Sequence, residues 1–116
     1  MKHKSKLTVL DNPLVTLKAA ELNRYLQTAP REFQGGPVKH ITCRDGTVLS
    51  VQASEFSYCS PRNNAGPWKT VEVMFCNKND KPIYFTVAPD DSYIGGYIPI
   101  EDVAKEILAR GNARLT

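Results

Sequence analysis

The fold is decided by residues 38–54, VKHITCRDGTVLSVQAS, in which two runs of β-compatible residues flank Asp45-Gly46. Asp-Gly is a pair that the two-residue type I′ turn of a β-hairpin prefers. A turn of that type predicts that Cys43 faces Val48 and that Thr42 faces Leu49. It also divides the side chains between two faces. One face holds Val38, His40, Thr42, Leu49, Val51 and Ala53, and the other holds Ile41, Cys43, Val48 and Ser50. The sequence leaves open which face is the inner one.

Further β-runs lie on both sides of this hairpin. Apolar residues alternate with polar ones over residues 71–75 and again over 83–87, with a polar turn between them. This period of two predicts a second hairpin. A loop at 88–96 leads to a short extended piece at 97–100, and residues 7–10 are compatible with a first strand. We therefore expect a mostly antiparallel sheet of four to six strands.

A helix is predicted at each end of the β-region. Asn12 and Pro13 are typical of a helix start, and Pro30 disfavours helical geometry before it, so the first helix is expected to end near Thr28. Its apolar stripe is Val15, Ala19, Leu22 and Leu26, while Lys18, Glu21 and Arg24 take the wetter side. The second helix is expected over 101–110 and is stopped by Gly111. The sum is an α+β domain with both helices packed on the sheet.

The size and charge of the chain limit its organisation and partners. The chain has 116 residues, 41% of them hydrophobic, which suits a single domain over residues 7–116 behind a basic tail, free to be disordered, at residues 1–6. The tail lysines, Lys2, Lys4 and Lys6, are three of fifteen basic side chains that stand against twelve acidic ones. The body is therefore neutral, which argues against nucleic acid as a partner, because nucleic-acid binders line basic residues along one folded face.

No run approaches the roughly 18 apolar residues of a membrane span. The apolar stretch near the N-terminus is also too short for a secretory signal. We therefore expect a cytoplasmic protein with no membrane partner. The three cysteines, Cys43, Cys59 and Cys76, are widely spaced and suit a reducing compartment. A structural zinc site needs about four soft ligands at familiar spacing, so we expect neither a metal nor a cofactor.

The loop between the two predicted hairpins, Tyr58 to Trp68, concentrates aromatic, arginine and amide side chains, and so does the neighbouring loop from Asp90 to Tyr97. Loops carry function more often than cores do. An arginine fork with amides and aromatic rings can bind an anionic or aromatic group. The candidate ligand- or partner-binding residues are Tyr58, Ser60, Arg62, Asn63, Asn64, Trp68, Tyr93 and Tyr97.

Two other interpretations of this loop stay open. In the first, it is a structured turn, shaped by proline, glycine and asparagine, with Trp68 plugging the sheet edge. In the second, Cys59 is the nucleophile of an enzyme and His40 its base. That chemistry needs a base within hydrogen-bond reach and a lowered thiol pKa, whereas most free cysteines are buried and unreactive. No set of acid, base and nucleophile is complete, so we expect a protein without catalytic activity.

Residues 50–75, SVQASEFSYCSPRNNAGPWKTVEVMF, and residues 96–103, GYIPIEDV, resemble a family of small phage and prophage proteins. In that family a strand enters a Tyr-Cys-Ser/Thr-Pro-Arg loop, and a Gly-Pro-aromatic step leads into a Val-Glu-Val strand. A Gly-Tyr-x-Pro segment then precedes the final helix. The resemblance covers roughly the second half of the chain and implies a phage accessory role without a particular chemistry.

Small phage accessory proteins often antagonise host defence, so by analogy the resemblance implies a counter-defence protein, of anti-CRISPR or other anti-defence type, in the host cytoplasm. Such a protein binds a host defence protein directly or sequesters a nucleotide-type ligand. The second mode needs a pocket built from Arg62 with Tyr58, Trp68 and Tyr97. We expect that pocket to be completed across a homo-oligomer interface, because one small domain offers little concavity.

Overall fold

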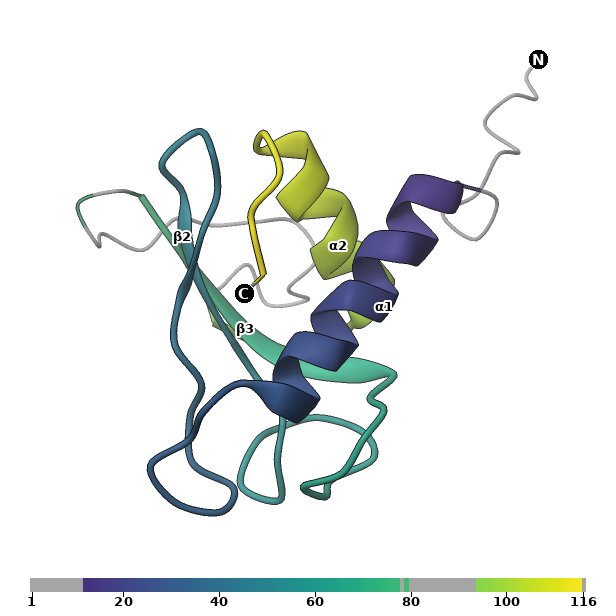
Figure 1. Ribbon diagram of the computed structural model, residues 1–116, viewed down its shortest axis with the longest axis vertical. Helices are drawn as coiled ribbons and strands as arrows, with labels where there is room; N and C mark the ends of the chain where they lie inside the picture. The colour runs from purple at the N-terminus through teal and green to yellow at the C-terminus, as the bar shows by residue number, and fades with distance from the viewer. Residues whose placement is uncertain (1–11, 78, 80–93, 116) are drawn as a thin grey trace.

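Two helices lie against one face of a four-stranded antiparallel sheet in the computed structural model, which describes residues 12–77, 79 and 94–115 (Figure 1). The elements are α1 (Pro13–Thr28), β1 (Ile41–Thr42), β2 (Val48–Gln52), β3 (Thr70–Cys76), β4 (Ile94–Pro99) and α2 (Ile100–Ala109). The sheet order is β1-β2-β3-β4. The predicted α+β fold with a helix from each end of the chain is confirmed. The predicted tail at 1–6 and the strands at 7–10 and 83–87 lie outside the described residues.

Helix α1 begins where the sequence predicts, because Asn12 caps it. The Oδ1 atom of Asn12 accepts the N–H of Leu14 at 3.0 Å and that of Val15 at 3.4 Å. The predicted apolar stripe is buried. Lys18 departs from the prediction, because it is buried instead of lying on the wetter side. Its Nζ donates to the carbonyl of Ala113 at 3.2 Å and pairs with Glu21 at 2.9 Å, which offsets the cost of removing an ammonium from water.

The β1–β2 hairpin is present, but the predicted register is wrong by one residue. Thr42 pairs with Val48 and not with Leu49. The Cys43 N–H donates to the Thr47 carbonyl at 2.7 Å, so the connection has three residues and ends at Gly46, whose φ is 95°. A left-handed glycine after the turn adds one residue to the two-residue connection.

This shift exchanges the faces of the first hairpin strand, since neighbouring side chains point to opposite sides of a sheet. Ile41 and Cys43 therefore join Leu49 and Val51 in the core, while His40 is exposed on the outer side. The shifted register buries two apolar side chains that the predicted one separates from Leu49 and Val51.

Strand β3 lies between β2 and β4. Its inward side chains pair across the sheet, Phe75 with Leu49 and Val73 with Val51. Strand β4 corrects the predicted loop at 88–96, because it already begins at Ile94 and contains Gly95 and Gly96. The register of β3 with β4 is irregular between Val71 and Val73. Glycine within a strand commonly marks such an irregularity or a close approach of another segment.

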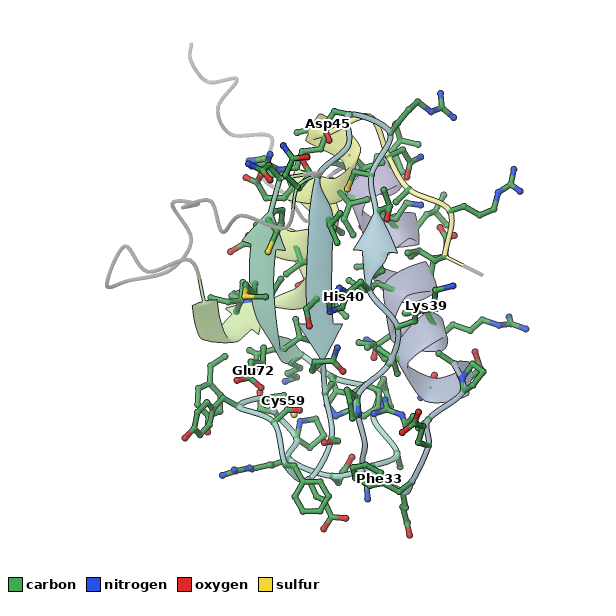
Figure 2. All side chains as sticks on the ribbon, turned by 90° about the vertical axis from the view of Figure 1, so that its left-hand side faces the viewer. Phe33, Lys39, His40, Asp45, Cys59 and Glu72 are labelled. Carbon is green, nitrogen blue, oxygen red and sulfur yellow. The ribbon has the colours of Figure 1, made fainter. Side chains whose placement is uncertain are left out.

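The core fills the space between the sheet and the two helices. Its largest fully buried side chains include Trp68, Phe75, Leu22, Leu26, Leu49, Ile98 and Ile107. The other face of β2 and β3 carries the partly buried Ser50, Gln52 and Glu72. Within the described residues no helix lies over that face, which Figure 2 shows toward the viewer. Neither of the two helices in the described ranges combines the length and apolar character that a membrane crossing needs.

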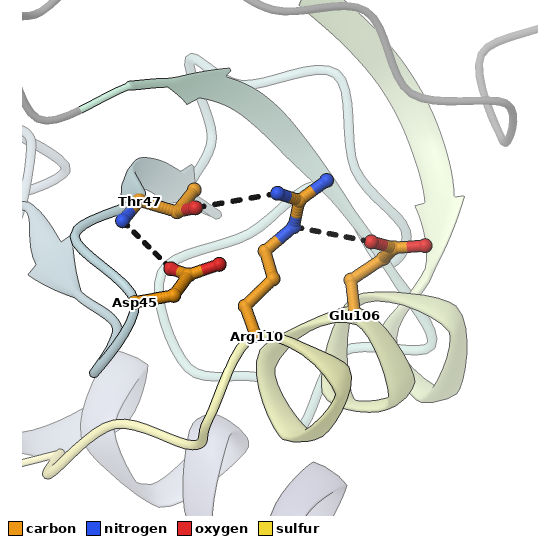
Figure 3. Close-up of polar contacts among 4 residues, drawn as sticks. All are labelled: Asp45, Thr47, Glu106 and Arg110. Atoms are coloured by element: carbon orange, nitrogen blue, oxygen red, sulfur yellow. Dashed lines mark hydrogen bonds and ion pairs between the residues drawn. The ribbon is translucent and has the colours of Figure 1, made fainter.

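The end of α2 is tied to the β1–β2 turn by Arg110 (Figure 3). Its Nε lies 3.2 Å from the Glu106 carboxylate, and its Nη1 donates to Thr47 Oγ1 at 3.2 Å. The guanidinium also lies 5.0 Å from the ring centroid of Phe75. The Thr47 N–H donates to Asp45 Oδ1 at 2.8 Å. These contacts form a structural clamp that orients the C-terminal helix on the sheet.

Candidate functional site

Three of the predicted binding residues, Tyr58, Arg62 and Tyr97, come together at the loop end of the sheet. The ring centroids of Tyr58 and Tyr97 are 6.0 Å apart, with the planes inclined by 35°. The Arg62 guanidinium carbon lies 5.4 Å from the centroid of the Tyr58 ring, within the range of a cation–π contact. Tyr58 is 54% exposed and Tyr97 52%. We call these three residues the Tyr58 cluster, and it faces solvent.

Main-chain contacts position the Tyr58 cluster. The Tyr97 N–H donates to the Tyr58 carbonyl at 2.9 Å, which joins β4 to the loop. Gly96 lies so close that a Cβ added to it would be 2.9 Å from the Cβ of Tyr58. Tyr97 has a φ of 55°, a left-handed conformation that is uncommon for residues other than glycine. Conformations of this kind gather at functional sites.

Ser60 and Asn63 hold the loop in shape. The Ser60 hydroxyl lies 2.7 Å from that of Thr70, and the two residues also form a β-bridge. Asn63 Oδ1 accepts the N–H groups of Ala65 and Gly66 at 3.0 and 2.9 Å. These two predicted residues therefore act as the structured-turn interpretation expects.

Asn64 is used in the same way. Its Oδ1 accepts the Glu55 N–H at 2.9 Å, and its Nδ2 donates to the Glu55 carboxylate at 2.8 Å. These hydrogen bonds among polar side chains and to the main chain define the shape of the loop. Tyr93, the remaining candidate of the neighbouring loop, lies outside the described residues.

Trp68 belongs to the core and not to the binding surface. It is 2% exposed, and its ring lies against Gly66. Asn23 of α1 holds its main chain: the Trp68 N–H donates to Asn23 Oδ1 at 2.8 Å, and Asn23 Nδ2 donates to the Trp68 carbonyl at 2.9 Å. Within the described residues its buried Nε1 has no hydrogen-bond partner. A buried ring cannot stack on a ligand, so the structure corrects the predicted role of Trp68.

The geometry of Cys59 is that of a packed thiol. It is 1% exposed, and its Sγ donates to the Ser54 carbonyl at 3.3 Å. Burial raises the pKa of this thiol, and the nearby Arg62 lowers it only in part. His40 is exposed and lines a separate hollow of about 620 Å³ with Ser50 and Gln52. Figure 2 shows His40 beside the strands and Cys59 among the loops at one end of the sheet. The nucleophile and base of the enzyme interpretation are therefore not assembled.

Two further aromatic residues, Phe33 and Phe56, are exposed, and the sequence analysis did not single them out. Phe33 is 59% exposed and Phe56 64%. Both line a hollow of about 340 Å³ that also includes Glu72. The sequence contained a signal for their exposure, because both phenylalanines stand outside any alternating or helical apolar pattern.

In the described parts of the chain, no three His, Cys, Asp or Glu side chains gather as a metal site requires.

Comparison with known proteins adds no assignment to this geometry. No protein-family model, no curated protein and no solved structure matches the chain.

Proposed function

We propose that this chain is a small phage or prophage accessory protein without catalytic activity that binds a host defence protein through the Tyr58 cluster. The observation that carries the proposal is the half-exposed pair of tyrosines with a guanidinium over one ring. Tyrosine and arginine are among the residue types that dominate protein–protein binding energies. The exposed aromatic surface of the two tyrosines would be removed from water by a bound partner, and this burial favours binding.

The rigidity of the surface supports the same conclusion. Hydrogen bonds from Ser60, Asn63 and Asn64 hold the loop, and the Tyr97 N–H ties it to β4. A preorganised surface loses little conformational entropy when a partner binds. A small inhibitor with such a surface can bind a larger protein more tightly than one whose surface must be ordered on binding.

The biological setting comes from the resemblance of residues 50–75 and 96–103 to small phage proteins. Counter-defence in the host cytoplasm is the analogy that this resemblance supports. A second mode, sequestration of a nucleotide-type signal, is favoured by the cation–π pair of Arg62 and Tyr58, since such a pair can also cover a base. That mode requires a homo-oligomer in which a second copy covers the open side of the Tyr58 cluster.

The test expresses the protein in bacteria that carry single, defined defence systems and measures the plating efficiency of a sensitive phage. We expect the wild-type chain to restore plaques on the strain whose defence it inhibits. The double variant Tyr58→Ala/Arg62→Ala should lose at least about tenfold of that effect, in line with the loss of a binding hot spot. Alanine keeps the Cβ that lies against Gly96, so the fold should be retained.

A control variant removes one large exposed apolar side chain and one exposed arginine from a different surface. Leu17 and Arg24 are exposed on α1, so Leu17→Ala/Arg24→Ala should plate like the wild type. Circular-dichroism melts of all three chains show whether each is folded. Full activity of the Tyr58→Ala/Arg62→Ala chain would remove the Tyr58 cluster as the binding site. Native mass spectrometry of the purified protein separates the two modes, since it shows either a stoichiometric host protein or a retained nucleotide on an oligomer.

A further inference from the structure

A hollow of about 360 Å³ lies where the β1–β2 turn meets the C-terminal segment. Figure 2 shows this turn, marked by Asp45, at the opposite end of the sheet from Cys59 and its loop. The lining residues are Thr42, Arg44, Asn112, Ala113 and Arg114. Among the described residues the lining thus includes two arginines and no acidic residue.

The side chains around this hollow offer hydrogen-bond donors. The carbonyl oxygen of the Asn112 side chain accepts the Ala113 N–H at 2.7 Å, which leaves its amide nitrogen as a donor. Thr42 is exposed and contributes a hydroxyl. Within the described ranges, the ion pairs are made by Lys18 with Glu21 and by Arg110 with Glu106, so neither lining arginine is neutralised there.

Main-chain contacts hold the β1–β2 turn against the C-terminal segment, and each of these two segments carries one of the lining arginines. The Arg44 N–H donates to the Asn112 carbonyl at 2.8 Å. A Cβ added to Gly111 would lie 2.9 Å from the Cβ of Arg44, so the segments touch closely. The buried Lys18 donates to the Ala113 carbonyl at 3.2 Å and fixes the segment from the side of α1.

The acidic side chains of Asp45 and Glu21 interact with groups other than the lining arginines. Asp45, next to Arg44, accepts the Thr47 N–H at 2.8 Å, and hydrogen bonding with Thr47, helped by the charge of Arg110, lowers the pKa of its carboxyl. Glu21 pairs with Lys18 at 2.9 Å. Neither Asp45 nor Glu21 forms an ion pair with Arg44 or Arg114 in the described residues, so the guanidinium groups of the two lining arginines can bind an anionic ligand.

We propose that this hollow binds the phosphate group of a small phosphorylated ligand. Two planar guanidinium forks match the oxygens of a phosphate, and the amide and hydroxyl donors complete its coordination. A volume of about 360 Å³ lies at the lower end of the range of small-molecule sites, which suits a phosphate with a small organic group. This site is independent of the partner surface under Proposed function and goes beyond it.

The test is an NMR titration of the full-length, ¹⁵N-labelled protein with three probes: inorganic phosphate, adenosine monophosphate and a short single-stranded DNA. We expect the first two to shift the amide signals of Arg44, Asn112 and Arg114. Arg44→Gln/Arg114→Gln should raise the dissociation constant at least about tenfold, because hydrogen bonds to charged groups are among the strongest. Arg24→Gln, which removes one exposed positive charge from α1, should bind like the wild type.

The outcomes separate the sources of the phosphate. Tighter binding of adenosine monophosphate than of inorganic phosphate identifies a phosphate ester as the ligand, and equal binding identifies the free anion. Binding of the DNA alone would overturn the assignment of a small ligand. Absence of shifts at the three amides would overturn the site itself, as would equal affinities of the wild type and the Arg44→Gln/Arg114→Gln variant.

Discussion

The Tyr97 N–H donates a hydrogen bond to the Tyr58 carbonyl at 2.9 Å, so two exposed tyrosines that are far apart in the sequence form one unit. The bond places the ring of Tyr97 beside that of Tyr58, and it uses a left-handed residue in β4 to do so. The glycine before Tyr97 makes room for the Cβ of Tyr58. The close packing of Tyr58 against β4 therefore depends on the absence of a side chain at Gly96.

Gly96→Ala should lower the free energy of unfolding by about 1–3 kcal/mol, the usual cost of an overpacked contact. The added Cβ would lie 2.9 Å from that of Tyr58. Urea unfolding of the variant measures the loss. Gly96→Ala should cost less in a Tyr58→Gly background, where the opposing Cβ is absent. Equal costs in both backgrounds would show that the two residues do not meet.

Asn23→Ala should destabilise the protein by about 1–3 kcal/mol, because it leaves the Trp68 N–H and carbonyl without their partners. The higher helix propensity of alanine offsets a few tenths of a kcal/mol of this loss. Urea unfolding followed by the fluorescence of the single tryptophan reports the change. Arg24→Ala, at the neighbouring exposed position, should change stability little. An Asn23→Ala variant as stable as the wild type would contradict a stabilising role of the two hydrogen bonds between Asn23 and the Trp68 main chain.

Gly46→Ala should cost roughly 1 kcal/mol, since Gly46 has a φ of 95° that a Cβ disfavours. Gly46→Asn should cost less, because asparagine tolerates left-handed geometry better than alanine. Thermal unfolding of the two variants gives the comparison. Equal stability of the wild type and both variants would argue against the three-residue turn and its register.

The Cys59 thiol should react slowly with a thiol reagent at neutral pH. It is buried, and burial raises its pKa, so little thiolate is present. Mass spectrometry after timed labelling identifies the modified cysteine, and the same protein in urea supplies the reference rate. Labelling of the folded protein as fast as in urea would restore Cys59 as a candidate nucleophile.

The stability of the protein should fall as the pH rises from about 9 to about 11. Burial raises the pKa of Cys43 to about 11 in the folded chain, against an ordinary value of 9.0. Between these values the unfolded chain has lost the thiol proton and the folded chain keeps it, so alkali favours unfolding. Below pH 9 both states are protonated, and the contribution is fully present.

Cys43→Ala isolates this effect from other groups that titrate in alkali. Its free energy of unfolding should fall less steeply between pH 9 and 11 than that of the wild type. Parallel pH profiles of the two chains would show that the Cys43 thiol does not contribute.

The sequence by itself determined the elements whose signals are local. Asn12, Pro13 and the stripe from Val15 to Leu26 predicted α1, and alternation over 71–75 predicted β3. Gly111, with a φ of 90°, ended α2 as expected. Caps, breakers and apolar periods act within a few residues, so they can be read without the fold. The concentration of aromatic, arginine and amide side chains in the 58–68 loop can likewise be read from the sequence alone.

Tertiary structure alone decided which of those side chains remain free. Trp68 and Tyr58 lie in the same loop, yet Asn23 of α1 holds the first in the core and β4 leaves the second at the surface. The hairpin register followed the same rule: the Asp45-Gly46 pair allows two connections, and burial of Ile41 and Cys43 selects one. Burial of a side chain depends on segments that are distant in the sequence, and the conformational preferences of neighbouring residues do not predict how those segments pack.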